Sequence, residues 1–142
     1  MTTVIGSRNE ASLTRIVFAG VAAAVVAAVG DAVVYALARA IKVTMVMPYQ
    51  PGIQPAILPI GTVVSAAVVG AIAATVVFAV LSKVSPNGVR VFQIVGGLFL
   101  VLTFAAPLSV ASTDTATRVT LLLMHIVAGS SIIASLTLLG RR

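Results

Sequence analysis

Four long apolar runs alternate with short polar segments along this chain of 142 residues. A membrane hydrocarbon core of about 30 Å requires roughly 20 helical residues, because an α-helix rises about 1.5 Å per residue. Each of the four runs reaches that length and is bordered by charged or helix-starting residues, as membrane-spanning helices are. The pattern therefore predicts four spanning helices, over residues 16–38, 58–82, 91–112 and 119–140.

The composition favours a lipid environment over a soluble fold. Hydrophobic residues make up 60% of the chain and charged residues 8%, and the mean hydropathy is +1.19. A soluble domain of this size has too little interior to hide so much apolar surface from water. We therefore predict an all-α fold, an integral membrane bundle of four transmembrane helices in contact with the lipid bilayer. The bundle is expected to form one domain over residues 16–140, between an N-terminal tail (1–15) and a short end (141–142).

Basic residues are distributed unevenly between the two predicted sides of the membrane. The side of both termini and the second loop carries six of them, and the side of the first and third loops carries three. Because cytoplasmic loops are enriched in Lys and Arg, we expect both termini in the cytoplasm and a multi-pass protein of the plasma membrane. The net charge of +6 then reflects topology and anionic headgroups, and no nucleic acid partner is expected. The two sets are Arg8, Arg15, Lys83, Arg90, Arg141 and Arg142 on the first side, and Arg39, Lys42 and Arg118 on the second.

The first apolar run has an alternative interpretation as a signal peptide, cleaved after the triplet Ala36-Leu37-Ala38. The leading polar segment and the apolar stretch both exceed the usual lengths of signal peptides. We therefore expect this run to remain as the first helix.

The predicted loops differ in length and character. Residues 85–88 (Ser-Pro-Asn-Gly) suit a tight turn between the second and third helices, and a Thr or Asp cap within 112–117 is expected to start the fourth. The first loop, over residues 43–57, is longer and holds three prolines among apolar residues. It is too broken for a spanning helix and too apolar for a free linker. We expect it at the outer interface, either as a lid over the bundle or as a surface loop that only packs against it.

Two ionisable side chains interrupt the apolar runs at nearly the same predicted depth. Asp31 lies eight residues before Arg39 and His125 lies seven residues after Arg118, which places both roughly 10 to 12 Å inside the outer boundary. An unpaired carboxylate at that depth costs several kcal/mol unless it stays protonated, and a hydrogen bond to an imidazole would hold it in place. We hypothesise a direct contact between Asp31 and His125. The alternative is that Asp31 bonds Tyr35 or Arg39 on its own helix while His125 bonds a neighbouring carbonyl.

Further polar groups are expected in the same part of the bundle. Asp31 lies on a row of alanines in the first helix, and such small-residue faces pack against other helices in lipid. Pro107 in the third run has no N–H and should leave a carbonyl near Thr103 without its helical donor. Asp31, Tyr35, Thr103 and His125 are therefore the candidate binding residues of a polar pocket beneath the first loop.

The inventory of reactive residues limits other chemistry. The chain has no cysteine and a single histidine. A structural zinc site needs about four ligands, and His125 with Asp31 would supply only half of them, while bis-histidine haem ligation is impossible within one chain. No nucleophile, base and orienting group form a recognisable catalytic set, and phosphate-binding glycine loops are missing from the sequence. We expect neither an enzyme nor a bound metal or cofactor.

Three short features together resemble a known family. They are the acidic residue late in the first helix (Asp31), the stretch Leu102–Ser109 (LTFAAPLS) in the third run and the stretch Leu121–Gly129 (LLLMHIVAG) in the fourth. In these features the chain resembles a bacterial family of four-span membrane proteins that is classed only as a domain of unknown function. The resemblance covers the hydrophobic part of the chain, and it implies the four-span architecture without an activity to carry over.

Two functional classes remain after these exclusions. The first is a small membrane protein with a binding or accessory role, whose polar pocket takes an unknown small molecule or a membrane protein partner. The second is a small proton-coupled transporter, because a lone carboxylate in the first of four helices is similar to the arrangement in small multidrug exporters. Rows of small residues pack helices within a chain or between chains, so a homo-oligomer is compatible with both classes.

Overall fold

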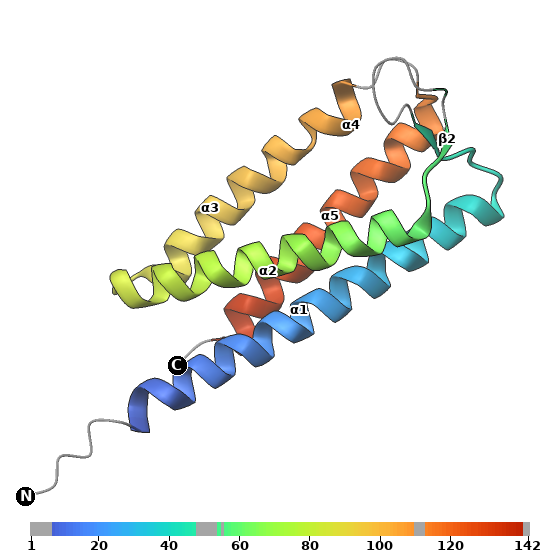
Figure 1. Cartoon of the computed structure of the whole chain (residues 1–142). Helices are drawn as coiled ribbons and strands as arrows, with labels where there is room; N and C mark the ends of the chain where they lie inside the picture. The colour runs from blue at the N-terminus through green and yellow to red at the C-terminus, as the bar shows by residue number, and fades with distance from the viewer. Residues whose placement is uncertain (1–6, 48–53, 55, 110–112, 141–142) are drawn as a thin grey trace, which may run out of the picture.

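The chain folds into four membrane-length spans built from five helices (Figure 1). The computed structural model describes residues 7–47, 54, 56–109 and 113–140, and side chains from residue 13 onward. Within this part, the segments long and apolar enough to cross a membrane are Leu13–Ala40, Ile60–Val84, Gly88–Ser109 and Thr115–Leu139. The predicted all-α fold with four transmembrane helices is confirmed. The helices are α1 (Ser7–Ala40), α2 (Ile60–Val84), α3 (Gly88–Thr103), α4 (Ala105–Ser109) and α5 (Thr115–Leu139).

The third span departs from the continuous helix expected over 91–112. It begins at Gly88, directly after the tight turn, where the Gly88 N–H donates to the carbonyl of Ser85 at 3.1 Å. It is then interrupted at Phe104, so that α3 and α4 form one span from two pieces. The end of the predicted helix, at 110–112, lies outside the described residues.

The four spans form one bundle, in which α2 and α5 contact each other little. α1 packs against α2 and α5, and α3 packs against the same two helices from the other side (Figure 1). Two short strands, α4 and the start of α5 lie at one end of the bundle, which we call the hairpin end. The α2–α3 turn, the start of α1 and the end of α5 lie at the other end, which we call the termini end.

The first loop is folded onto the hairpin end. Its strands β1 (Val46–Met47) and β2 (Ala56–Ile57) pair antiparallel, with Val46 opposite Ile57 and Met47 opposite Ala56. Val43 and Met45 are buried, and the backbone N–H of Leu58 donates to the carbonyl of Met45 at 2.8 Å. Residues 48–53 and 55, which include the three prolines of this loop, lie outside the described residues.

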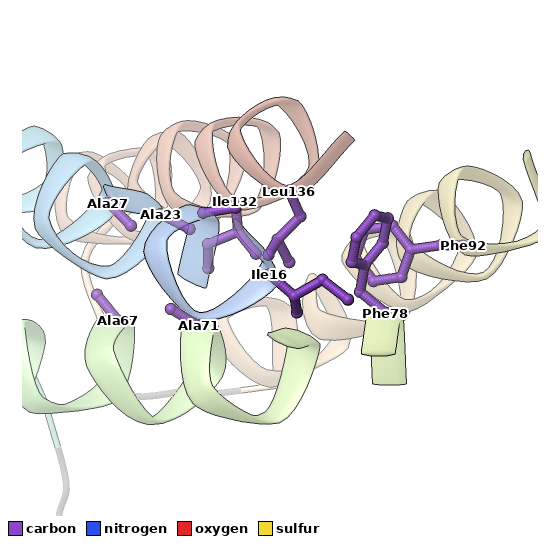
Figure 2. Close-up of a cluster of buried hydrophobic side chains, with 10 residues drawn as sticks. Ile16, Ala23, Ala27, Ala67, Ala71, Phe78, Phe92, Ile132 and Leu136 are labelled. Carbon is purple, nitrogen blue, oxygen red and sulfur yellow. The ribbon is translucent and has the colours of Figure 1, made fainter. Parts of the chain in front are cut away.

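Two apolar clusters fill the bundle. The termini-end cluster combines alanines, which let α1 and α2 approach closely, with an edge-to-face pair of rings, Phe78 and Phe92, at 5.1 Å and 79° (Figure 2). The hairpin-end cluster joins the end of α1, the first loop, α2 and the start of α5. The buried members of the first are Ile16, Ala19, Ala23, Ala27, Ala67, Ala71, Phe78, Phe92, Ile132 and Leu136, and those of the second are Ala38, Val43, Met45, Val63, Leu121 and Met124.

The outer faces of the spans are apolar as well. Large hydrophobic side chains such as Phe18, Val69, Leu98 and Phe99 are exposed along the helices, with no polar face opposite the core. A helix that is apolar on its outer side requires lipid as its solvent, and its backbone groups are satisfied within the helix. The bundle is therefore that of a multi-pass membrane protein in contact with a lipid bilayer.

Candidate buried polar site

Asp31 lies on α1 between the two apolar clusters. It follows Ala23 and Ala27 on the same face of the helix, and only 6% of its surface is exposed. Its Oδ1 atom is buried and has no hydrogen-bond partner among the described residues. Because buried polar atoms are paired in the large majority of cases, an ionisable group with such an atom inside a membrane span is unusual.

The two residues expected as local partners of Asp31 bond to the first loop. The hydroxyl of Tyr35 donates to the carbonyl of Leu58 at 2.8 Å. Nη1 of Arg39 donates to the two carbonyls of residues 43 and 44, at 3.1 and 3.0 Å. α1 ends here, and the chain that leaves a helix needs side-chain donors for its carbonyls. Tyr35 and Arg39 thus fasten the loop, and neither of them bonds to Oδ1 of Asp31.

His125 is fixed by its own helix. Its Nδ1 atom lies 2.7 Å from the carbonyl oxygen of Leu121, one turn earlier on α5. A carbonyl can only accept, so Nδ1 of His125 is the donor in this bond. This is the bond to a neighbouring carbonyl that the alternative interpretation expects. Among the described residues, no hydrogen bond or ion pair joins His125 to Asp31.

A close approach between α1 and α5 sets the relative depth of these two residues. A Cβ built on Gly30 would lie 2.7 Å from Cγ1 of Val127, so the helices nearly touch at this point. Asp31 is the next residue along α1, and α5 runs in the opposite direction, which places Asp31 about one residue from the level of His125. The equal depth deduced from the spacing of the basic residues agrees with this register.

A second close approach sets the depth of the third span. A Cβ built on Gly129 of α5 would lie 2.5 Å from Cδ1 of Leu100 on α3. One helical turn further toward the hairpin end, Phe104 is level with His125. The interruption of the third span therefore lies at the depth of His125 and Asp31.

Thr103 repairs part of this interruption. The N–H of Phe104 donates to the carbonyl of Val101, at 3.1 Å, three residues earlier instead of four. The hydroxyl of Thr103 donates to the carbonyl of Leu100, at 2.6 Å. The carbonyl of Thr103 has no helical donor, because Pro107 stands where that N–H would be. The freed carbonyl deduced from the sequence thus coincides with a break between two helices, and the Thr103 side chain serves the backbone of its own span.

The structure gives the four predicted residues a common region but no shared hydrogen bond. Asp31, His125 and Thr103 lie at one depth on three different spans, and Tyr35 lies one turn nearer the hairpin end. α5, which carries His125, packs against both α1, which carries Asp31, and α3, which carries Thr103. We call this depth of the bundle the polar level.

A network at the hairpin end was missed by the sequence reasoning. Asp114 caps α5, as expected for an Asp or Thr cap, with Oδ1 accepting from the Thr117 N–H at 2.9 Å. Its Oδ2 accepts from the hydroxyls of Thr117, at 2.7 Å, and Thr44, at 2.5 Å. The N–H of Met45 donates to the Thr117 hydroxyl at 3.0 Å. The sequence signals the cap, but Thr44 lies 70 residues before Asp114 and carries no signal of its own.

The hydrogen bonds of this network also set the charge of the cap. The Thr44 hydroxyl, followed by the N–H and hydroxyl of Thr117, lowers the pKa of Asp114 from 3.8 to about 2. Asp114 is therefore a carboxylate at any ordinary pH and holds the loop and α5 together as an acceptor.

Within the described part of the chain, no three His, Asp or Glu side chains gather where they could hold a metal ion. The polar level offers hydrogen-bonding atoms of single residues, spread over three spans, and the chemistry open to it is proton binding and hydrogen bonding.

One comparison with known proteins gave a match. A family model described as "Family of unknown function (DUF6069)" matches residues 11–142. No curated protein and no solved structure matches the chain.

Proposed function

The chain belongs to this family of unknown function, and from its polar level we propose that it is a small membrane protein with a binding or accessory role. The family match covers all four spans, in agreement with the resemblance to an uncharacterised four-span family. Asp31 and His125 are the proposed binding residues. Tyr35 and Thr103 are proposed to shape the site, the first by fastening the loop above it and the second by supporting the broken span beside it.

The unpartnered oxygen of Asp31 is the observation that carries this proposal. A buried acceptor without a donor costs about 1–3 kcal/mol, and an ionisable group within the membrane costs more. Ala23 and Ala27 show that the same face of α1 packs well with small apolar residues. A carboxyl at such a position weakens the empty bundle, and this cost is offset when a proton or a ligand group binds it.

The stability of Asp31 variants tests the proposal. We expect Asp31→Leu to stabilise the ligand-free protein in detergent by about 1–3 kcal/mol, because it removes an unsatisfied buried polar group. Asp31→Asn keeps the shape and the polarity, and should change the stability less. Thr75→Val is the matched control, since the Thr75 hydroxyl already donates to the carbonyl of Ala71 at 2.7 Å.

A loss of stability in both Asp31 variants would contradict a binding role. It would mean that the carboxyl holds the bundle together, as a purely structural group does. The measurement is the midpoint of unfolding by a denaturing detergent, followed by the helical circular dichroism signal.

A proton-coupled transporter is the second candidate. It is favoured by the position of Asp31 between two buried apolar clusters, which close the bundle on both sides as the occluded state of a transporter requires. Purified protein in liposomes should then carry a proton-dependent flux that is lost in Asp31→Asn. A flux that survives this substitution excludes Asp31 as the proton carrier.

The orientation in the plasma membrane is part of the proposal. Arg15, Lys83 and Arg90 lie at the termini end, which supports a cytoplasmic location for both termini. Because the chain has no cysteine, single cysteines placed at Lys83 and at Lys42 can be labelled from one side of intact cells. Labelling of the position at 42, and not of the one at 83, by an impermeant reagent outside the cell is the expected result, and the reverse pattern would refute the orientation.

A further inference from the structure

The polar level is closed along the axis of the bundle. Toward the hairpin end, Met45 and Leu121 are buried in the hairpin-end cluster, and the loop is tied down by the Tyr35 and Thr117 hydrogen bonds. Toward the termini end, Ala27 is fully buried against the next layer of the termini-end cluster. A ligand that travels from the aqueous phase on either side would have to pass a packed apolar layer.

At this depth, the third span packs less tightly against the bundle than the other spans do. The buried residues of α3 are Gly88 and Phe92, both near the termini end, and the only one of α4 is Pro107. Between them the span is interrupted at Phe104, which is half-buried and level with His125. The span thus buries little against the bundle where it passes the polar level, and its broken backbone lacks the rigidity of a continuous helix.

At the polar level, Oδ1 of Asp31 is a buried acceptor that has no donor among the described residues. Near the same depth, Pro107 removes the N–H that would otherwise bond the carbonyl of Thr103 one turn earlier. No basic residue occurs in α1 between Arg15 and Arg39, and the other described basic residues lie at the ends of their spans. A buried carboxyl with no cation in the described interior of the spans complements a group that donates hydrogen bonds and carries positive charge.

We infer that the polar level takes a membrane-dissolved amphiphile with a protonated amine head, and that this ligand enters from the lipid past the break in the third span. The inference rests on the proposed binding function and names its ligand class and its route. The ammonium head would satisfy the carboxyl of Asp31, while the alkyl chain stays among the exposed apolar side chains of the third span. The absence of an aqueous route excludes small water-soluble amines.

A tryptophan at the break reports on this route. The chain contains no tryptophan, so Phe104→Trp introduces a single fluorophore at the polar level. Phe99→Trp is the matched control, because Phe99 lies on the same helix, is 66% exposed and faces lipid away from the site. The probes are dodecylamine, which partitions into liposomes, and ethylamine, which has the same head group and stays in water. The unfolding midpoint of the unmodified chain, with and without dodecylamine, is a second measurement that needs no substitution.

The expected result is a saturable change of the Phe104→Trp emission with dodecylamine, weakened at least about tenfold by Asp31→Asn and absent in Phe99→Trp. An equal response to ethylamine at the same aqueous concentration would overturn the route from lipid and leave the binding function standing. A dodecylamine response that is unchanged by Asp31→Asn, or equal in both reporters, would overturn the ligand class. The binding function itself is decided separately, by the stability of Asp31→Leu.

Discussion

Thr117 joins the first loop to the last span. We predict that its hydroxyl contributes more to the free energy of unfolding than any other hydroxyl at the hairpin end. It accepts the N–H of Met45 at 3.0 Å and donates to Asp114 at 2.7 Å, and the side chain is fully buried. Thr117→Val keeps the shape and removes the hydroxyl. The substitution leaves the Met45 N–H buried without an acceptor.

The expected cost follows from this single orphaned donor. A buried N–H without a partner costs about 1–3 kcal/mol, and water cannot replace the lost bond, because Met45 is itself fully buried. Asp114 is exposed and can exchange the lost donor for water, so its share is small. We therefore expect Thr117→Val to lower the free energy of unfolding by about 2 kcal/mol.

Thr120 provides a matched control one turn along the same helix. It is also buried, but its hydroxyl donates only to the carbonyl of Ala116, at 2.8 Å, within α5. Thr120→Val should change the stability by less than about 0.5 kcal/mol, because that carbonyl keeps its helical donor. Thr117→Ser keeps the hydroxyl, and its loss should be limited to about 0.8 kcal/mol for one methyl group.

The assay is unfolding by a denaturing detergent in mixed micelles, followed by circular dichroism for all three variants and the unmodified chain. The reasoning is refuted if Thr117→Val costs no more than Thr120→Val. Such a result would show that the loop is held by apolar packing of Met45 alone, and that the hydrogen bond to α5 adds nothing.

Three further predictions concern other parts of the structure. Because the folded-state pKa of Asp114, about 2, lies below its ordinary value of 3.8, its stabilising contribution is complete above pH 4 and is lost as the pH falls from 4 to 2; unfolding midpoints measured across this range should show this acid limb, and Asp114→Asn should remove it. Tyr35→Phe should lower the free energy of unfolding by about 1 kcal/mol, since it deletes the hydrogen bond that ties α1 to Leu58, at the end of the first loop. An unchanged unfolding midpoint would mean that the loop does not depend on this bond. Gly88→Ala should be strongly destabilising, because the added Cβ would collide with backbone atoms of α2. Gly97→Ala adds a Cβ that meets nothing within 4 Å, and it should stabilise the helix by up to about 1 kcal/mol. Equal effects of the two substitutions on the unfolding midpoint would disprove the close approach at the turn.

The depth of each polar residue could be deduced from the sequence because a helix advances by a fixed rise per residue. Counting from Arg39 and Arg118 placed Asp31 and His125 at one level, and the close approach of Gly30 to Val127 gives the same answer. The four spans followed from the length of the apolar runs for the same reason. Their composition also required lipid, since no arrangement of so short a chain could bury them.

The partners of those residues were decided by tertiary structure. The side chains of Tyr35 and Arg39 were expected near Asp31, yet they bond carbonyls of the first loop, whose path is not encoded in any local pattern. The donors available to a buried carboxyl depend on how each helix is rotated about its axis. They also depend on which side chains are used to satisfy the unpaired backbone groups at the helix ends. No hydrogen bond joins Asp31 to His125 among the described residues, and Nδ1 of the imidazole bonds a carbonyl of its own helix instead.

The sequence alone therefore determined how far along the membrane normal each group lies, which is a one-dimensional property of a helix. Only the tertiary structure decided what surrounds each group, because neighbours depend on how the spans pack side by side. Thr44 and Asp114 are the clearest case, since two residues 70 positions apart form a 2.5 Å hydrogen bond that closes the hairpin end. The break at Phe104 is the intermediate case. Pro107 predicted a free carbonyl from the sequence, but only the register of α3 against α5 showed that the break lies level with His125.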